Sequence, residues 1–479
     1  MKPRHIAYII WIIIALLGTV CLIVPDGGFS IGKWTLRWPT LAEALDMDRD
    51  SGNNFDFGIL NDSLLAEIDT IVLSTDSIVE QDTLVTKDSV QQKSQPIIPE
   101  VNIANIDSRA YLMTFYAALD STSDKPIRVV HYGDSQIEED RITNILRERW
   151  QKEYGGGGVG LIPLHQTIPT RSIRQWLSID GVVQTTLGGP QRYLVYGPRR
   201  MRLEGNDYGV MGQVAVMDST LVAGSEDIVL NIEPIDKKRQ LHNYFNRIRL
   251  LTDNISGYIL AQDTLLPLTA SPNHLITLPD STTKCEIHLQ GKGCVYGVSL
   301  ETNNGVIVDN IPMRGCSGNI FTKIDSTQLC HFYQETNTRL IILQFGGNMI
   351  PQTENPSTIS GYVRSTLRQQ VRYIRACAPQ ASILFIGPSD MSTNIDGQMT
   401  TYPLLPYMDK LLKKMATEEQ IAYWSMYDAM GGKDSMVKWV ENGLAGSDYV
   451  HFTRAGANNI SKKLYRWIMT YPDSLNTKL

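Results

Sequence analysis

The sequence predicts a three-layer α/β/α protein, in which helices cover both faces of a parallel sheet, with an all-β unit inserted into it. Apolar strand-like runs alternate with helical patterns over residues 101–168 and 290–479, which is typical of such a sheet. Between them, residues 169–289 consist of short runs rich in β-branched and aromatic residues, broken by Gly, Asn, Asp and Pro. Runs of this kind at close spacing predict a β-sandwich.

The chain begins with an apolar stretch, residues 6–24, that contains no charged side chain. It is long enough to cross a bilayer, and it follows Lys2 and Arg4, which are expected to remain in the cytoplasm. The main alternative is a cleaved signal peptide, but no Ala-x-Ala-like site follows Val24. We therefore interpret residues 1–25 as a transmembrane signal anchor, which leaves the rest of the protein extracytoplasmic, in the periplasm if the cell is Gram-negative.

An acidic region follows the apolar stretch, with Asp76, Asp82 and Asp88 spaced six residues apart. It contains no apolar pattern of domain length, so it lacks the means to bury a core. We interpret residues 26–100 as an extracytoplasmic linker that holds the following domain away from the membrane.

Charge and cysteine usage exclude several classes of function. The net charge is −6, and no long block of Lys or Arg is present to neutralise phosphates, so no nucleic-acid partner is expected. The sequence has no Cys-x-x-Cys pair and no His-Glu-x-x-His, so no metal site is expected. Of the six cysteines only Cys21 lies in the predicted membrane segment, and the odd number that remains makes disulfides optional.

The α/β region opens with a helical pattern over residues 107–118 and an apolar strand that starts at Ile127 and ends in Gly133-Asp134-Ser135. An amphipathic helical pattern follows directly, so Ser135 is expected in the first turn of a helix. There, unpaired N–H groups and the helix dipole favour a developing negative charge. The alternative is that Asp134 or Ser135 merely caps the helix.

The glycine-rich run at residues 155–160 satisfies the pattern G-x-G-x-x-G of dinucleotide sites. It follows a helix instead of joining a strand to a helix. We therefore interpret it as a glycine-rich helix exit, and we expect no cofactor.

In the second half of the chain, three strands and three helices alternate. The strands are expected at residues 340–345, 382–386 and 421–425, and the helices at 360–376, 404–417 and 454–469. Sites in such sheets lie at the carboxyl ends of the strands.

Three loops in these positions carry groups that could converge on Ser135. Gly315 can bring a backbone N–H close to a ligand. Asn348 follows the strand that begins at residue 340, and Asp448 and His451 precede the last helix. Because Asp448 and His451 are three residues apart, the carboxylate can hold one imidazole N–H while the other ring nitrogen faces the serine. Each residue alone has a simpler explanation as a cap or surface group, but together and in this order they predict a hydrolytic triad.

These motifs resemble the SGNH, or GDSL-type, hydrolase family over about residues 101–165 and 290–475. The resemblance implies that Ser135 is the nucleophile, His451 the base and Asp448 the acid that orients it. It also implies an oxyanion hole made by the N–H groups of Ser135 and Gly315 and the side chain of Asn348.

Two features depart from the family pattern. Gln136 stands where Leu or His is more usual, and the inserted unit separates the first and second blocks. An insertion at this position resembles the membrane-associated O-acetylpeptidoglycan esterases, where it is likened to carbohydrate-binding modules. Trp176 and Tyr193 are then candidates for glycan contacts.

The function implied is an extracytoplasmic serine esterase that removes O-acetyl groups from a cell-wall or other glycan through an acyl-serine intermediate. One alternative is an O-acetyltransferase that uses the same site. It would receive its acyl group from a membrane acyl carrier and pass it to a sugar hydroxyl. A second is a non-catalytic glycan-binding protein. The partners expected are an acetylated glycan and, through the N-terminal helix, the membrane.

Overall fold

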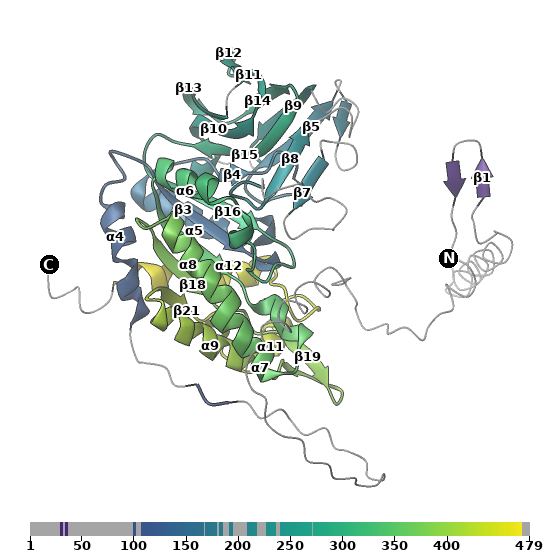
Figure 1. Ribbon diagram of the computed structural model, residues 1–479, viewed down its shortest axis with the longest axis vertical. Coiled ribbons are helices and arrows are strands. Elements are labelled where there is room, and N and C mark those ends of the chain that lie inside the picture. Colours follow the sequence, from purple (N-terminus) through teal and green to yellow (C-terminus); the bar gives the residue numbers. More distant parts are fainter. Residues whose placement is uncertain are drawn as a thin grey trace, which may run out of the picture. The chain divides into compact units, whose positions relative to one another are not determined.

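The computed structural model describes the backbone of residues 29–31, 34–36, 99–101, 107–166, 168–179, 182–184, 191–194, 208–217, 227–235, 240–270 and 272–471. The chain divides into two units, Met1–Asp82 and Thr83–Leu479. In the first unit, β1 (Phe29–Ile31) pairs antiparallel with β2 (Trp34–Leu36). The second unit contains the remaining described elements (Figure 1).

The predicted parallel sheet is present and has five strands in the order β16-β3-β17-β18-β21. They are β3 (Ile127–Gly133), β16 (Val306–Pro312), β17 (Thr338–Gln344), β18 (Ser382–Ile386) and β21 (Ala422–Trp424). All four neighbouring pairs are parallel. Every residue of β3 is buried, as expected for a strand covered on both faces.

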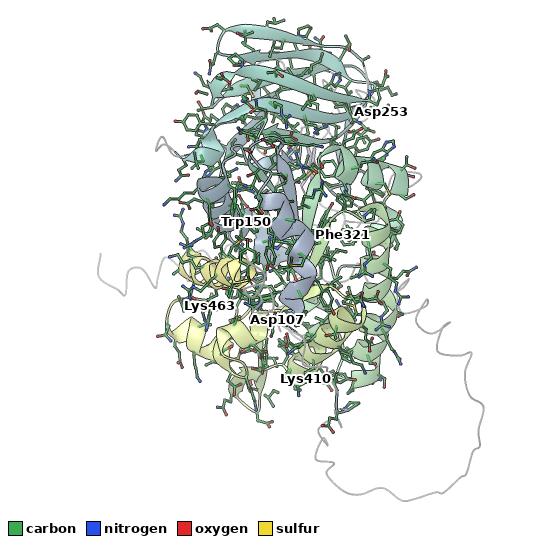
Figure 2. The ribbon with its side chains drawn as sticks, turned by 90° about the vertical axis from the view of Figure 1, so that its left-hand side faces the viewer. Asp107, Trp150, Asp253, Phe321, Lys410 and Lys463 are labelled. Carbon is green, nitrogen blue, oxygen red and sulfur yellow. The ribbon has the colours of Figure 1, made fainter. Side chains whose placement is uncertain are left out.

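Helices cover both faces of this sheet, which confirms the predicted three layers. One face carries α6 (Ser326–Glu335), α8 (Arg368–Cys377) and α9 (Leu405–Glu418), and the other carries α4 (Met113–Leu119), α5 (Thr143–Tyr154) and α12 (Arg454–Met469). Two hydrophobic cores result, and the fully buried side chains of Phe321 and Trp150 belong to one each (Figure 2). The shorter helical segments are η1 (Ser108–Leu112), η2 (Ser135–Asp140), η4 (Leu241–Asn243), η5 (Phe321–Lys323), η6 (Gly347–Gln352), α7 (Pro356–Gly361), η7 (Tyr362–Leu367), α10 (Met426–Met430) and α11 (Ser435–Glu441).

The segment after β3 differs from the prediction. Ser135 begins a short 3-10 segment, η2 (Ser135–Asp140), and the long helix α5 starts only at Thr143. Glu139 and Asp140 have φ angles of 59° and 60°, so the chain bends through the left-handed region there and cannot continue as one helix. Ser135 therefore lies in the first turn of this short 3-10 segment and not in the amphipathic helix α5 that the sequence pattern marked.

The inserted unit is a sandwich of two antiparallel sheets around one hydrophobic core. One sheet has the order β13-β10-β15-β8-β7, with β4 paired to β15, and the other has the order β12-β11-β14-β9-β5-β6. Its strands are β4 (Gly160–Ile162), β5 (Arg174–Ile179), β6 (Val182–Gln184), β7 (Gln191–Leu194), β8 (Gln213–Met217), β9 (Asp227–Glu233), β10 (Phe245–Asp253), β11 (Ser256–Ala261), β12 (Thr264–Leu268), β13 (Asn273–Thr282), β14 (Cys285–Gln290) and β15 (Gly293–Glu301).

The predicted boundaries of the inserted unit are too narrow. Both β4 and β15 lie in its sheets, so the unit reaches from Gly160 to Glu301, beyond the predicted 169–289. The pairing of β4 with β15 joins segments far apart in the chain, and no local pattern reveals it.

The glycine-rich run is a helix exit, as predicted. Gly155 follows α5 directly, with a φ of 75°. After Gly155, the backbone that enters the sandwich passes close to the backbone that leaves the sandwich. A Cβ at Gly158 would lie 2.1 Å from Leu300 O, and one at Gly156 would lie 2.6 Å from Val306 O. The glycines therefore allow the two chain connections between the parallel-sheet domain and the sandwich to run in direct contact.

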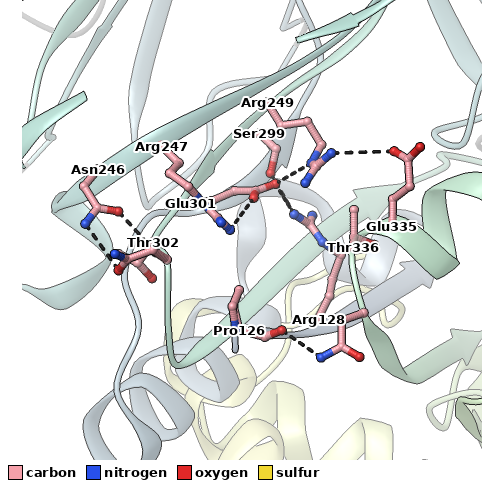
Figure 3. Close-up of polar contacts among 12 residues, drawn as sticks. Pro126, Arg128, Asn246, Arg247, Arg249, Ser299, Glu301, Thr302, Glu335 and Thr336 are labelled. Atoms are coloured by element: carbon pink, nitrogen blue, oxygen red, sulfur yellow. Dashed lines mark hydrogen bonds and ion pairs between the residues drawn. The ribbon is translucent and has the colours of Figure 1, made fainter. Parts of the chain in front are cut away.

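A buried ionic cluster lies between the sheet and the sandwich (Figure 3). Arg128 of β3 donates from Nη1 to Asp309 of β16 at 2.6 Å and from Nη2 to Glu301 of β15. Arg247 and Arg249 of β10 also pair with Glu301, both at 3.2 Å. The cluster thus ties the β-sandwich to the parallel sheet.

The predicted membrane anchor lies outside the described residues. Within the part of the chain that the structure describes, no helix has both the length and the apolar character needed to cross a bilayer.

Candidate active site

Three predicted residues form a continuous hydrogen-bonded chain. Ser135 Oγ lies 2.8 Å from His451 Nε2, and His451 Nδ1 lies 2.8 Å from Asp448 Oδ2. Ser135 is half-buried, whereas the side chains of His451 and Asp448 are 38% and 50% exposed. The geometric prediction is confirmed, and the arrangement allows a proton to move from the serine hydroxyl to an imidazole open to solvent.

The loop that carries Asp448 and His451 is fixed at both ends. Gly446 N donates to His451 O at 2.8 Å, which closes a tight turn around Asp448. Thr453 Oγ1 accepts from Gly456 N at 3.3 Å and caps α12. The imidazole therefore stands two residues before a capped helix.

Local hydrogen bonds keep Asp448 ionised. Partial burial would raise the pKa of its carboxyl, but the His451 ring and the backbone N–H groups of Val450 and His451 donate to it and lower the pKa to about 2. A carboxylate in this state holds the N–H on Nδ1 and leaves Nε2 free to accept a proton from Ser135.

The loops of Gly315 and Asn348 meet beside Asp134. Asn348 Nδ2 donates to Cys316 O at 3.0 Å and lies 3.5 Å from Asp134 Oδ2. Gly315 has a φ of 72°, which favours glycine, and a Cβ there would have no neighbour within 4 Å. The Gly315 N–H has no hydrogen bond within the described part of the chain.

Asp134 caps the segment that bears the serine. Its Oδ1 accepts from Gln136 N at 2.9 Å, so the capping alternative holds for Asp134 and leaves the Ser135 hydroxyl free to meet His451. Burial raises the pKa of the Asp134 carboxyl to about 6, because the backbone hydrogen bond and the charge of His451 offset only part of the desolvation.

Gln136 belongs to the site, although the sequence marked it only as a departure from the family pattern. Its Nε2 donates to Val450 O at 2.6 Å and to Ser389 Oγ at 3.1 Å. The side chain is 6% exposed and joins the serine segment to the residue beside His451. Nothing local in the sequence predicts these contacts.

A small pocket of about 30 Å³ lies beside Ser135. Its lining includes Asn348, Pro388, Met391 and Val450. A larger hollow of about 550 Å³ between β20 (Gln398–Thr401) and α11 contains none of the predicted site residues, so we place the site at the smaller pocket.

The strand β5 carries Trp176, whose ring lies 5.1 Å from the guanidinium carbon of Arg174. Tyr193 lies on β7, and its side chain is outside the described residues. Trp176 is not among the described residues that line the pocket beside Ser135, and the glycan contacts of both residues stay a prediction.

Residues 280–458 match the model of the GDSL-like Lipase/Acylhydrolase family. This range holds Gly315, Asn348, Asp448 and His451, whereas Ser135 lies before the inserted unit. A comparison with the curated proteins finds no match.

Among solved structures, a peptidoglycan O-acetylesterase is similar in fold, with a TM-score of 0.57 and 21% identity over 78% of this chain and 98% of that chain. A protein from Bacillus subtilis matches with a TM-score of 0.29 and 12% identity, over 58% and 88% of the two chains. A phospholipase A1 from Streptomyces albidoflavus matches with a TM-score of 0.26 and 15% identity, over 33% and 79%. The chain therefore carries a GDSL-like lipase/acylhydrolase domain, which supports a carboxylic ester hydrolase, and its fold resembles that of a peptidoglycan O-acetylesterase.

Proposed function

We propose that the protein is an extracytoplasmic serine esterase that removes O-acetyl groups from a cell-wall glycan. The observation that carries the proposal is the unbroken chain from Ser135 Oγ through the His451 ring to Asp448, with 2.8 Å at each step. Such a chain activates a hydroxyl for attack on an ester carbonyl.

In this mechanism His451 accepts the Ser135 proton as Oγ attacks the acetyl carbonyl. It then donates the proton to the departing sugar oxygen, which leaves an acetyl-serine. A water molecule then attacks the acetyl carbonyl as His451 accepts its proton. The tetrahedral intermediate collapses with cleavage of the bond to Ser135 Oγ, His451 returns the proton to Oγ, and acetate leaves. The ionised Asp448 stabilises the imidazolium at each stage.

The N–H groups of Ser135 and Gly315 and the side-chain amide of Asn348 donate hydrogen bonds to the negative oxygen of the tetrahedral intermediate. The Asn348 amide keeps its bond to Cys316 O and exchanges its longer contact with Asp134 for the oxyanion. Each such donor contributes about 3 kcal/mol to lowering the barrier.

Two features of the site support an acetylated glycan as substrate. The pocket beside Ser135 is small, which suits a short acyl group, and the exposed His451 leaves room for a bulky leaving group. A solved structure of similar fold, matched over 98% of its length, is that of a peptidoglycan O-acetylesterase.

The experiment measures acetate release from O-acetylated peptidoglycan and from 4-nitrophenyl acetate. Ser135→Ala and His451→Ala should each lower kcat by about a thousandfold or more, and to similar extents, because they belong to one catalytic unit. Asp448→Asn should cost less, and Asn348→Ala about a hundredfold with little change in KM. Undiminished hydrolysis by Ser135→Ala would refute the mechanism.

The same assay with a second sugar present tests transfer. Acetylated sugar formed at the expense of free acetate would show that the site passes its acyl group to a hydroxyl acceptor, which is the acetyltransferase alternative. A wild-type protein that binds the glycan and releases no acetate would instead support a non-catalytic role.

We also propose that residues 1–25 anchor the protein in the membrane with its catalytic domain outside the cytoplasm. The charge-free stretch after Lys2 and Arg4 supports this. Fractionation of cells expressing the full chain should recover it with the membranes, and protease added from outside the cytoplasmic membrane should reach the catalytic domain. A mature chain that is soluble and begins near Val24 would contradict the anchor.

A further inference from the structure

Met391 forms part of the wall of the pocket beside Ser135, and the mechanism does not use it. Both residues line this pocket together with Asn348, and the Met391 side chain is buried. Its position is fixed by close neighbours. A Cβ added at Gly347 would lie 3.7 Å from Met391 Sδ, 3.8 Å from Met391 Cε and 3.7 Å from Asp134 Oδ2. The thioether end of Met391 therefore lies against the loop of Gly347 and Asn348, close to the segment that bears the nucleophile.

This pocket receives the acyl chain of the ester in the proposed mechanism. The acyl carbon bonds to Ser135 Oγ, and its oxygen accepts hydrogen bonds from the Gly315 N–H and the Asn348 amide. The leaving oxygen faces His451, whose ring is open to solvent. The pocket is left for the remaining substituent of the carbon, which is the acyl chain. Its volume of about 30 Å³ is on the order of one water molecule or methyl group, so the lining side chains limit the length of that chain.

Hydrogen bonds on both sides hold the Met391 backbone in place. The preceding residue, Asp390, is fully buried, and its carboxyl accepts from Thr401 Oγ1 and from Met436 N, both at 2.8 Å. Met391 O itself accepts from Tyr402 N at 3.1 Å. Because the backbone is held in this way, it cannot move far into space left by a shorter side chain. Truncation of Met391 should therefore enlarge the pocket and not collapse it.

The other apolar residues of the lining are less suited to set the length of the pocket. The Phe345 ring packs edge-on against another aromatic ring, with 6.1 Å between the centroids, and Pro388 is a rigid ring. Val450 lies in the turn that carries His451. Methionine is unbranched and fills irregular gaps, so the length of Met391 can change without a change in the backbone around it.

We propose that Met391 is the specificity-determining residue that limits the acyl group to acetyl. Its side chain occupies the space that the further carbons of a propionyl or butyryl group would need. The inference rests on the proposed function and deepens it, because it assigns the limit on acyl length to one side chain outside the triad and the oxyanion donors.

The test compares kcat/KM for 4-nitrophenyl acetate, propionate and butyrate, with the uncatalysed rate subtracted. In the wild type, each added methylene should lower kcat/KM by about tenfold or more. Met391→Ala should cleave the butyrate at least about tenfold better than the wild type does, with little change for the acetate. Met391→Leu keeps the volume of the side chain and should keep the wild-type profile. Met391→Val is a smaller truncation and should give an intermediate profile.

Met415→Ala is the matched control. Met415 of α9 belongs to the same hydrophobic core as Met391 and is 1% exposed, but it is not among the described residues that line the pocket. This variant should lose stability through its own cavity and keep the wild-type preference for acetate. If Met415→Ala accepts the butyrate as well as Met391→Ala does, a loosened core explains the broader specificity and the proposal is wrong.

The outcomes separate this proposal from the proposed function. An unchanged chain-length profile in Met391→Ala and Met391→Val would overturn the assignment of Met391, while acetate release from O-acetylated peptidoglycan would still support the proposed function. A wild type whose preference for 4-nitrophenyl acetate depends on Met391, but which releases no acetate from the glycan, would contradict the proposed function and support the assignment. A wild type that cleaves none of the three esters would refute both.

Discussion

At the scale of single residues, Gln136 couples the nucleophile to its base. The serine segment and the histidine loop are 314 residues apart at this contact, and the Gln136 amide joins them by donating to Val450 O at 2.6 Å. A general base needs to be held within a few tenths of an ångström of its partner. We therefore regard Gln136 as a positioning residue for His451.

The first prediction concerns Gln136→Leu. The change removes both hydrogen bonds of the amide and leaves the Val450 carbonyl without its donor, so kcat should fall by about tenfold with a smaller change in KM. The matched control is Gln370→Leu, since Gln370 is also buried and hydrogen-bonded, to Thr322. Both variants should lose similar stability in urea denaturation, but only Gln136→Leu should lose turnover. Equal kcat values for the two variants would remove Gln136 from the site.

The second prediction concerns the buried acid Asp134. Its folded pKa, about 6, lies above the ordinary value of 3.8, so the ionised form opposes folding above pH 6 and this cost disappears as the pH falls through 3.8. Asp134→Asn should therefore raise the free energy of unfolding at pH 8, by up to about 3 kcal/mol. The gain should vanish near pH 4 in urea titrations.

Asp434 supplies a control of opposite sign. Hydrogen bonds from Thr400 and Thr401 lower the pKa of its carboxyl, so its contribution to stability is present above its ordinary pKa and is lost in acid. Asp434→Asn should lower the free energy of unfolding at pH 8. A stability change of the same sign in both variants would contradict the assignment.

The reactive residues could be predicted from sequence because their arrangement is local. Asp448 and His451 share one turn, and Ser135 follows a strand whose end the apolar pattern marks. The contact of Gln136 with Val450 could not be predicted, since it joins positions 314 residues apart. Only the folded sheet brings those positions together.

At the scale of elements, local patterns placed the helices and strands well where burial is continuous. The predicted helix 454–469 matches α12, and the strand 382–386 matches β18. The prediction failed at η2, where the left-handed residues Glu139 and Asp140 interrupt an otherwise helical pattern. Neither is a glycine, so the sequence gives no signal of that conformation.

The third prediction concerns the glycine crossing. Gly158→Ala combines a φ of 71° with a Cβ that would lie 2.1 Å from Leu300 O, so the backbone of one connection must move. Gly443→Ala is the matched control, because Gly443 has a φ of 69° and open space around its Cβ. Gly443→Ala should cost about 1 to 2 kcal/mol from conformation alone. In chemical denaturation, Gly158→Ala should lower the free energy of unfolding clearly more than Gly443→Ala. Equal losses would show that the close approach at Gly158 does not affect stability.

At the scale of the whole catalytic unit, the sandwich and the parallel sheet share more than a chain connection. Tyr296 and Leu251 of the sandwich belong to the same core as Tyr132 and Ile311 of the sheet. The buried cluster around Glu301 adds ionic contacts at this interface (Figure 3). A partly apolar interface with buried charge pairs favours joint unfolding of the two parts.

The last prediction tests this coupling through Glu301. Burial alone would raise the pKa of the Glu301 carboxyl, but Arg128, Arg249 and Arg247 together lower it, so it is ionised and paired in the folded protein. Glu301→Gln leaves buried guanidinium groups without their shared partner, which should cost about 3 to 5 kcal/mol. Glu233→Gln, which breaks the exposed pair with Arg174, should cost less than about 1 kcal/mol. In calorimetry the wild-type unit should unfold in one transition, and Glu301→Gln should lower its midpoint or divide it in two. A Glu301→Gln protein as stable as Glu233→Gln would show that the cluster does not hold the two parts together.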